Sequence, residues 1–366
     1  MLSLTKYVEW MAFVSFDEHV FDVMDSIILA QFAYLDMKDV WQQEPMKIRD
    51  LIEKQSSYSM QMVPDGQDHD DFIKMVARSD RYGQIWVKNN VDTFDEKEHI
   101  QFGAMTLQID EDHDLILFKG TDDSIVGWRE DFMMSFTKTF SQTASLAYLE
   151  SEIQPHKRYY VAGHSKGGHL AIYSTSQLME ENLAHIQAIY DLDGPGLCKD
   201  VMDPELTARI DAITMRVIPQ YCIVGNIFEP HFSNVHIVKS HAQGTMQHSL
   251  SSWQVDHKGL IEAKEEDPQS VWISTSINEW MKNVNQADRK TFVDQMFDAF
   301  SINGNVNFEE VKKGNLMDFH NLLMAFLRTD PVTKKTAVEL PVTAIANSGP
   351  IVKQRLWERI KERMKK

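Results

Sequence analysis

The feature of this sequence that most restricts its fold is a serine flanked by glycines, between an apolar run and a helical pattern. Residues 159–171 read YYVAGHSKGGHLA, so Ser165 occupies the centre of a G-x-S-x-G pattern. The apolar residues before Gly163 are typical of a buried strand, and residues 170–182 are typical of a helix. Larger side chains in place of the glycines would collide with the neighbouring strand and helix. The pattern predicts a sharp strand-to-helix turn that exposes the Ser165 hydroxyl at a sheet edge.

Other short apolar runs alternate with helical patterns along the chain. Residues 102–109 and 115–118, joined by an acidic turn, predict a hairpin. We expect further strands at residues 158–162, 186–192, 213–218 and 234–239, and helices at 17–40, 41–95 and 130–151. This alternation predicts an α/β fold with a mostly parallel central sheet flanked by helices.

The pattern changes near residue 270 and is helical from there to the end. We therefore expect a main domain over residues 1–269, with the N-terminal helices included, and a helical C-terminal extension or cap over 270–366. Residues 299–310 have the glycine and glutamate positions of a calcium loop. The first ligand position is Ala299, which has no side-chain oxygen, so we exclude calcium binding there.

Composition excludes several classes of partner. The chain has 37 Lys and Arg against 54 Asp and Glu, a net charge of −17, which argues against nucleic acid or an anionic membrane surface. Its two cysteines, Cys198 and Cys222, give neither a disulfide framework nor a zinc-ligand spacing. The N-terminus lacks a signal-peptide pattern, and no apolar run is long enough to span a bilayer. We expect a cytoplasmic protein without stable membrane insertion; the oligomeric state is not predicted.

A serine in such a turn is a candidate nucleophile, and the helix after it directs amide groups toward developing negative charge. A second segment, residues 115–128, runs from a strand into a polar loop containing glycine. In a fold of this kind one oxyanion donor comes from such a loop and the other is the amide after the nucleophile. These donors are the amides of Thr121 and Lys166, with the Thr121 hydroxyl as a possible third. The alternative is an ordinary turn between a strand and a helix.

The segments FKGTDDSIVGWREDF (118–132) and VAGHSKGGHLA (161–171) resemble the class 3, or fungal-type, lipases. In those enzymes a strand ending in Arg-Gly-Thr or Arg-Gly-Ser carries the oxyanion residue; here Lys119 replaces the arginine. More closely, residues 15–260 resemble a bacterial α/β-hydrolase family described mainly as a domain of unknown function. The resemblance implies the α/β-hydrolase fold.

A serine nucleophile needs a histidine that follows it in the chain. His241, His248 and His257 all lie in or after the loop that follows the last predicted strand, and spacing alone does not separate them. The resemblance does: the family has Gln-His shortly before Ser-Trp, matched here by residues 247–253. It therefore implies His248 as the general base.

The acid that orients this histidine is harder to identify. The class 3 position, after residues 215–218, contains Cys222 instead of a carboxylate; we expect Cys222 to be a small buried residue and not a nucleophile. Asp193, after the preceding strand, is the first candidate, although it could instead brace the Gly-Pro-Gly turn that follows. Asp191 and Asp256 are alternatives, as is a Ser-His dyad.

Together these residues predict a serine hydrolase without metal or organic cofactor. The resemblance implies a small-molecule carboxylic ester or lipid substrate, such as an acylglycerol or a lysophospholipid. Amidase and thioesterase activities use the same residues and stay open. The alternative is a scaffold that binds a partner through the hydrolase fold and has lost efficient chemistry, because no carboxylate occupies the Cys222 position.

Overall fold

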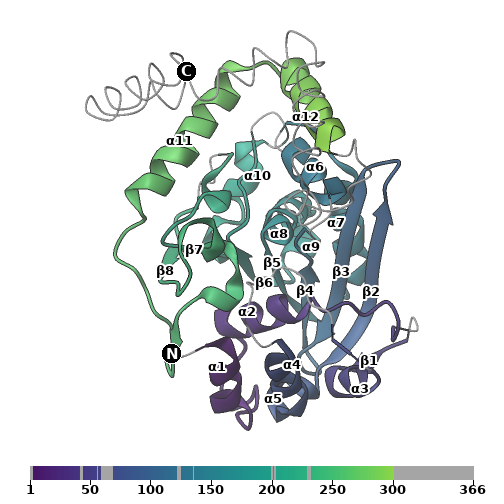
Figure 1. Cartoon of the computed structure of the whole chain (residues 1–366). Helices are drawn as coiled ribbons and strands as arrows, with labels where there is room; N and C mark the ends of the chain where they lie inside the picture. Colours follow the sequence, from purple (N-terminus) through teal and green to yellow (C-terminus); the bar gives the residue numbers. More distant parts are fainter. Residues whose placement is uncertain are drawn as a thin grey trace.

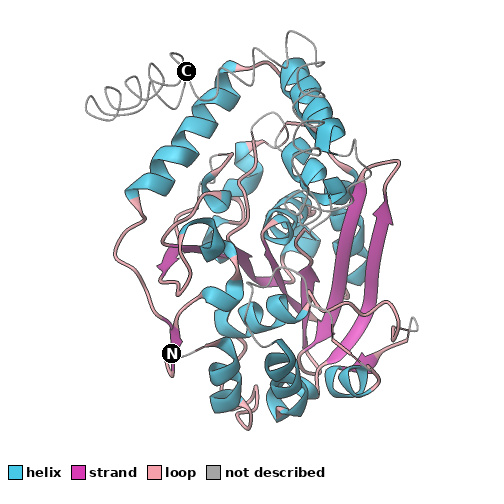
Figure 2. Cartoon of the chain, in the orientation of Figure 1, coloured by secondary structure: helices cyan, strands magenta, loops and turns pink. Residues whose placement is uncertain are grey.

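The computed structural model describes residues 3–300 except 42–43, 56, 59–68, 122–124, 135, 199–200, 202 and 229–231, and only the backbone of 125, 128 and 296–300. Its centre is an eight-stranded sheet in which spatial order follows chain order (Figures 1 and 2). The strands are β1 (Met46–Lys47), β2 (Trp86–Asp95), β3 (Ile100–Gln108), β4 (His113–Phe118), β5 (Arg158–His164), β6 (Ile186–Leu192), β7 (Thr214–Pro219) and β8 (Val235–Val238). Strands β1 to β4 are antiparallel neighbours, whereas β4 to β8 are parallel.

Helices cover both faces of this sheet. The N-terminal helices are α1 (Leu4–Met11), α2 (Val23–Phe32), α3 (Ile48–Glu53), α4 (His69–Arg78) and α5 (Asp80–Gly83). The later helices are α6 (Ile125–Met134), α7 (Phe140–Glu152), α8 (Lys166–Gln177), α9 (Glu180–Leu183), α10 (Pro204–Ala208), α11 (Pro268–Asn283) and α12 (Gln286–Phe300). Short 3-10 turns are η1 (Asp211–Ile213), η2 (Val224–Asn226), η3 (Gly244–His248) and η4 (Leu250–Ser252), and β9 (Val255–Asp256) pairs with β10 (Gly259–Leu260).

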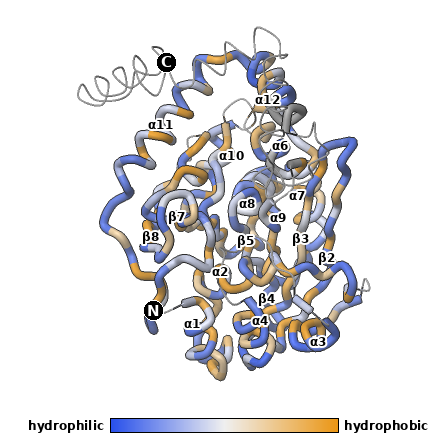
Figure 3. Tube along the Cα trace, in the orientation of Figure 1, coloured by the Kyte–Doolittle hydropathy of each residue, from blue (hydrophilic) through white to orange (hydrophobic). Residues whose placement is uncertain are grey.

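Alternation of side chains along the strands creates two hydrophobic cores. In β5, Tyr160 and Ala162 belong to the core beneath the N-terminal helices, whereas Tyr159 and Val161 belong to the core beneath α7 and α8. Successive residues of a strand point to opposite faces, so a sheet covered on both sides requires apolar residues at consecutive positions. In Figure 3 apolar segments gather around the sheet, and the tip of the β2–β3 hairpin is hydrophilic.

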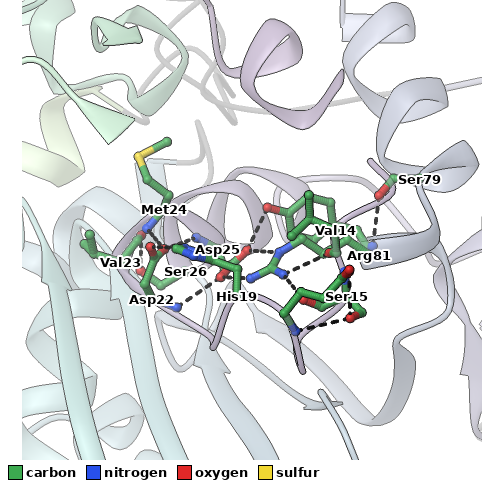
Figure 4. Close-up of polar contacts among 12 residues, drawn as sticks. Val14, Ser15, His19, Asp22, Val23, Met24, Asp25, Ser26, Ser79 and Arg81 are labelled. Carbon is green, nitrogen blue, oxygen red and sulfur yellow. Dashed lines mark hydrogen bonds and ion pairs between the residues drawn. The ribbon is translucent and has the colours of Figure 1, made fainter. Parts of the chain in front are cut away.

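The N-terminal helices are held together by a buried ion pair. Two nitrogens of Arg81 each lie 2.7 Å from an oxygen of Asp25 in α2, and the Tyr82 hydroxyl donates to the same carboxylate (Figure 4). Arg81 also donates to the carbonyls of Val14 and Ser15, in the loop between α1 and α2. These contacts fix α2 against the sheet, and α2 packs on β5 and β6.

Most expected strands match the structure, and three expected helices need correction. The strand predicted at 158–162 is β5, and the predicted hairpin is β3 and β4. The expected helix at 17–40 is shorter, because α2 covers only Val23–Phe32. The helix expected at 130–151 is divided into α6 and α7, where Thr139 caps the second helix through a hydrogen bond from Gln142.

The prediction that residues 41–95 are helical is wrong for Met46–Lys47, which form β1, and for residues 86–95, which form β2. One face of β2 is largely exposed, so its sequence lacks the continuous apolar run of a central strand. Helices α11 and α12 agree with the helical pattern after residue 270, and α11 begins at Pro268. Residues 301–366, which include the remainder of the expected extension and most of segment 299–310, lie outside the described residues. No described helix is long and apolar enough to cross a membrane.

Candidate active site

Ser165 lies in the sharp turn between β5 and α8. It is the N-cap residue of α8, with φ 57° and ψ −126°, a backbone conformation that a non-glycine residue adopts only under strain. Its amide donates to the carbonyl of Leu192 at the end of β6, over 2.9 Å. This conformation, at the carboxyl ends of parallel strands, is the geometry that a nucleophile elbow requires.

Two glycines allow the elbow to pack at backbone distance. A Cβ added at Gly163 would overlap the backbone of Gly167, and one added at Gly167 would overlap the carbonyl oxygen of Phe118, at the end of β4. Helix α8 therefore starts against the end of β4, where the candidate oxyanion loop begins. This is the collision that the sequence pattern predicted.

His248 contacts Asp193, which follows β6. Its Nδ1 atom lies 2.6 Å from Oδ2 of Asp193, and the Asp193 side chain is fully buried. A carboxylate only accepts hydrogen bonds, so the Nδ1 atom carries a proton, and in the neutral ring the lone pair is then on Nε2. This is the tautomer that a general base requires.

The Asp193 carboxylate is fixed by further donors. Its Oδ1 atom accepts from the Cys222 thiol over 3.0 Å and from the Gly225 amide over 3.1 Å. Its own amide donates to Val217, and its φ of 53° turns the chain away from β6. Burial, followed by the neighbouring Asp193 charge, raises the pKa of Cys222 well above its usual value. Cys222 is thus a fully buried protonated donor, in agreement with the sequence-based interpretation.

The alternative acids have other partners. Asp191 lies in β6 opposite Arg216 in β7, with 3.1 Å between their charged atoms, and it accepts from the Gly194 amide. Burial raises the pKa of Asp191 to about 6 even though Arg216 opposes the shift. Asp256 accepts from the amide of Lys258 in the β9–β10 turn. Of these three carboxylates, Asp193 is the one in contact with His248.

The other histidines in the same region of the sequence differ in exposure. His241 and His257 are exposed, and His236 contacts Glu262 and Asn234. The loop carrying His248 is fixed by Trp253, which is fully buried and donates to the carbonyl of Gln247 over 2.9 Å. This contact explains physically why the Gln-His and Ser-Trp pairs occur together.

His164, the residue before Ser165, contacts His248. Its Nε2 atom lies 2.8 Å from the carbonyl oxygen of His248, and the two rings are 4.6 Å apart between centroids. Since a carbonyl only accepts, Nε2 carries the proton and Nδ1 accepts from the Tyr34 hydroxyl, at 2.7 Å. Burial, then the nearby His248, lowers the pKa of His164 well below its usual value. A neutral imidazole therefore places His248 beside the Ser165 elbow.

The candidate oxyanion loop packs against the same elements. A Cβ added at Gly120 would overlap the Tyr34 hydroxyl and lie 2.8 Å from the carbonyl oxygen of His164. The next residue, Thr121, is buried, and its hydroxyl donates to Asp131 in α6. The expectation that this hydroxyl is a third oxyanion donor needs correction, because its single proton is directed at Asp131.

Lys166, expected to contribute its amide, has a buried side chain with partners of its own. Its Nζ atom lies 2.6 Å from Oε2 of Glu130 in α6 and 2.6 Å from the carbonyl oxygen of Gln101 in β3. Sequence reasoning missed Glu130 and Tyr34. For Glu130 a signal existed: a lysine in so tight a turn is buried by the packing around it, and a buried ammonium needs a carboxylate.

Helices α11 and α12 contact the elements that carry these residues. The side chain of Asn278 in α11 accepts from the Phe228 amide and donates to the carbonyl of Asn226 in η2, both over 2.8 Å. Helix α12 lies beside α6 (Figure 1), where Asp294 pairs with Arg129 at 2.7 Å. Among the described residues, no group of three or more His, Cys, Asp and Glu side chains is arranged to hold a metal ion.

The chain is similar to several proteins of known structure, at low sequence identity. Among solved structures the chain is similar to M37 lipase (14% identity, TM-score 0.38, covering 56% of this chain and 70% of that one). It is also similar to a mutant of MDLA from Penicillium cyclopium (13% identity, TM-score 0.40, covering 64% of this chain and 82% of that one). A third similar structure is lipase II from Rhizopus niveus (14% identity, TM-score 0.36, covering 65% of this chain and 83% of that one). No curated protein matches the chain. Residues 76–298, more than half of the sequence, match the Mbeg1-like family, and the chain therefore belongs to that family.

Proposed function

We propose that this chain is a serine hydrolase that cleaves carboxylic esters through an acyl-enzyme. The observation that carries the proposal is the 2.6 Å contact between Nδ1 of His248 and Asp193, beside the strained Ser165 turn. A nucleophile, a base and an acid that orients the base are the three groups that acyl transfer requires. Ser165 follows β5 and Asp193 follows β6, whereas His248 lies in η3, in the loop after β8.

In the proposed mechanism Ser165 attacks the acyl carbonyl while Nε2 of His248 removes the hydroxyl proton. The Asp193 carboxylate stabilises the imidazolium that forms and keeps the ring in the required tautomer. His248 then protonates the leaving alcohol, and a water molecule hydrolyses the acyl-enzyme by the same sequence of proton transfers. Electron pairs and protons balance without a cofactor.

The amides of Thr121 and Lys166 are the proposed oxyanion donors. Gly120 packs against the carbonyl of His164, and Gly167 packs against the end of β4, so the two donor segments adjoin. The amide of Lys166 also begins helix α8, whose dipole favours negative charge at that end. Donors already in place need no reorganisation when charge develops on the substrate oxygen.

The proposed substrate is an ester with an apolar acyl group, such as an acylglycerol or a lysophospholipid. Two large apolar side chains are exposed on segments that carry candidate site residues: Met246, two residues before His248, and Phe132, next to Asp131 in α6. Other apolar residues of this segment, Met134 and Phe136, are buried and belong to the interior. Exposed apolar side chains beside polar catalytic groups suit an acyl chain.

A fluorophosphonate probe tests the proposal, because it reacts with an activated serine. We expect the wild-type protein to be labelled, Ser165→Ala to be unlabelled, and His248→Ala to react slower by about 10³-fold or more. His241→Ala, in the same loop but exposed, is the matched control and keeps normal labelling. A folded wild-type protein that is not labelled would contradict the proposal and favour a scaffold without chemistry.

A series of p-nitrophenyl esters of increasing chain length identifies the substrate class. An apolar acyl site predicts that kcat/KM rises from acetate to medium-chain esters, since each buried methylene contributes about 0.8 kcal/mol. Equal kcat/KM for all chain lengths would exclude an acyl-chain site.

A further inference from the structure

The side chain of Lys166 is a buried cation directly after the nucleophile. It is 1% exposed, and its Nζ atom contacts the carbonyl and side-chain oxygens of Gln101 as well as Glu130. The proposed mechanism uses only the backbone amide of this residue. The ammonium group therefore needs a separate explanation.

Glu130 joins three elements besides its own helix. While one of its oxygens contacts Lys166 and accepts from the amide of Gln101 in β3, the other accepts from the amide of Ser141 in α7. Burial alone would raise the pKa of Glu130, but the charge of Lys166 and these hydrogen bonds together lower it. The pair is buried, and both of its side chains have further hydrogen-bond partners.

The ion pair is also linked to Thr121, the other proposed oxyanion donor. The residue after Glu130 is Asp131, which accepts from the Thr121 hydroxyl. A short path thus runs from the elbow through Lys166 and Glu130 to α6, and from Asp131 back to the Thr121 loop. The two ends of this path are the two proposed donors.

We propose that Lys166 and Glu130 are positioning residues whose ion pair sets the spacing of the two oxyanion amides, at Thr121 and Lys166. This inference rests on the proposed function. Helix α6 is fixed to the elbow by the pair, and the Thr121 loop is fixed to α6 by Asp131. Loss of the pair lets the two donors separate and weakens their contact with the transition state more than with the bound substrate.

A role in stability alone does not require a buried ion pair, whereas the proposed positioning role does. This difference between the two roles provides the test. Replacing a buried ion pair by apolar residues of similar volume is often neutral or stabilising, whereas removing one partner leaves an unpaired charge. The double variant Lys166→Met/Glu130→Leu keeps the Lys166 amide and removes both charges. Glu130→Gln keeps the shape of one partner and removes its charge.

The experiment compares kcat and KM for a short p-nitrophenyl ester, affinity for an alkyl boronic acid, and thermal stability. We expect the double variant to unfold at a lower temperature than the wild type, because the amides of Gln101 and Ser141 lose their acceptor. In the folded double variant kcat should be lower by about 10- to 100-fold, with KM changed little. Affinity for the boronic acid, which forms a tetrahedral adduct, should fall in parallel with kcat. A role limited to stability would not change these two quantities together.

The matched control is a second buried lysine–carboxylate pair, at the opposite ends of the strands. Lys157, just before β5, and Asp114, near the start of β4, lie 2.8 Å apart, away from the carboxyl ends of those strands. Lys157→Met/Asp114→Leu should keep kcat and boronic acid affinity within about twofold of the wild type, an effect near the size of ordinary surface substitutions.

The outcomes separate the two proposals. A wild-type protein without esterase activity or probe labelling would overturn both the proposed function and this inference. An active wild type together with a folded double variant whose kcat is unchanged would overturn the positioning role alone. Should the double variant not fold, Glu130→Gln decides the question: a fall of kcat at constant KM supports the role, and an unchanged kcat overturns it.

Discussion

His169, four residues after Ser165, is buried in an uncharged state. In α8, its Nδ1 atom donates to the carbonyls of Pro195 and Gly196, and its Nε2 atom accepts from Gln142. Burial lowers the pKa of His169 to about 4. These hydrogen bonds give His169 a structural role.

Because of the lowered pKa of His169, we expect the free energy of unfolding to fall in mild acid. The unfolded chain binds a proton at His169 near pH 6.5 while the folded chain resists protonation down to about pH 4. The stabilisation is therefore complete above pH 6.5 and declines as pH falls through that window, by up to about 3 kcal/mol from this group. In His169→Gln the free energy of unfolding, measured with urea from pH 7 to 4.5, should depend less on pH. His257→Gln, at an exposed position, is the control, and equal slopes in wild type and His169→Gln would contradict the assignment.

At the scale of elements, the close approach of α8 to β4 decides the shape of the site. At Gly167, in the first turn of α8, the helix backbone packs against the carbonyl of Phe118, the last residue of β4. The chain continues from β4 into the loop that contains Thr121. One missing Cβ therefore sets the distance between the nucleophile segment and the oxyanion segment.

The prediction is that Gly167→Ala is strongly destabilising, by about 3 kcal/mol or more, because backbone atoms must move to relieve the overlap. Gly244→Ala, in η3, is the matched control. Gly244 has φ 55° with no atom near the position of a Cβ, so alanine there costs only about 1 kcal/mol of backbone strain. Urea unfolding at neutral pH measures both. Similar losses in the two variants would show that conformation, and not contact with β4, explains the glycine.

At the scale of the whole molecule, the N-terminal helices form one side of the structure and also take part in the site. Helix α2 packs on β5 and β6, and Tyr34, just after it, contacts His164. The Asp25–Arg81 pair that holds these helices has both side chains at most 1% exposed. Stability and site geometry therefore depend on the same N-terminal layer.

Arg81→Met should destabilise the protein by about 3–5 kcal/mol, since it leaves the Asp25 carboxylate buried without its cation. Arg49→Met removes an arginine from a more exposed pair, with Asp80, and should cost about 0.5 kcal/mol. Equilibrium unfolding in urea provides the comparison. A small loss in Arg81→Met would mean that the loop carbonyls and Tyr82, rather than the charge, fix the N-terminal helices.

The sequence by itself determined the features that depend on neighbouring residues. The glycines around Ser165, the consecutive apolar residues of β5 and the turn before β4 are local patterns, and they specified the elbow, the parallel strands and the hairpin. Strand β2 was missed, because half of its side chains face away from the core and its pattern resembles a polar segment.

Tertiary structure decided which distant side chains meet. Asp191 and Asp193 are two residues apart, and the register of β6 against β7 places the first opposite Arg216 and leaves the second, beyond the strand, beside His248. Likewise, Lys166 meets Glu130 across 36 positions, and His164 meets Tyr34 across 130. Such contacts follow from how strands pair and helices pack on them, because burial brings together polar groups that have no relation in sequence.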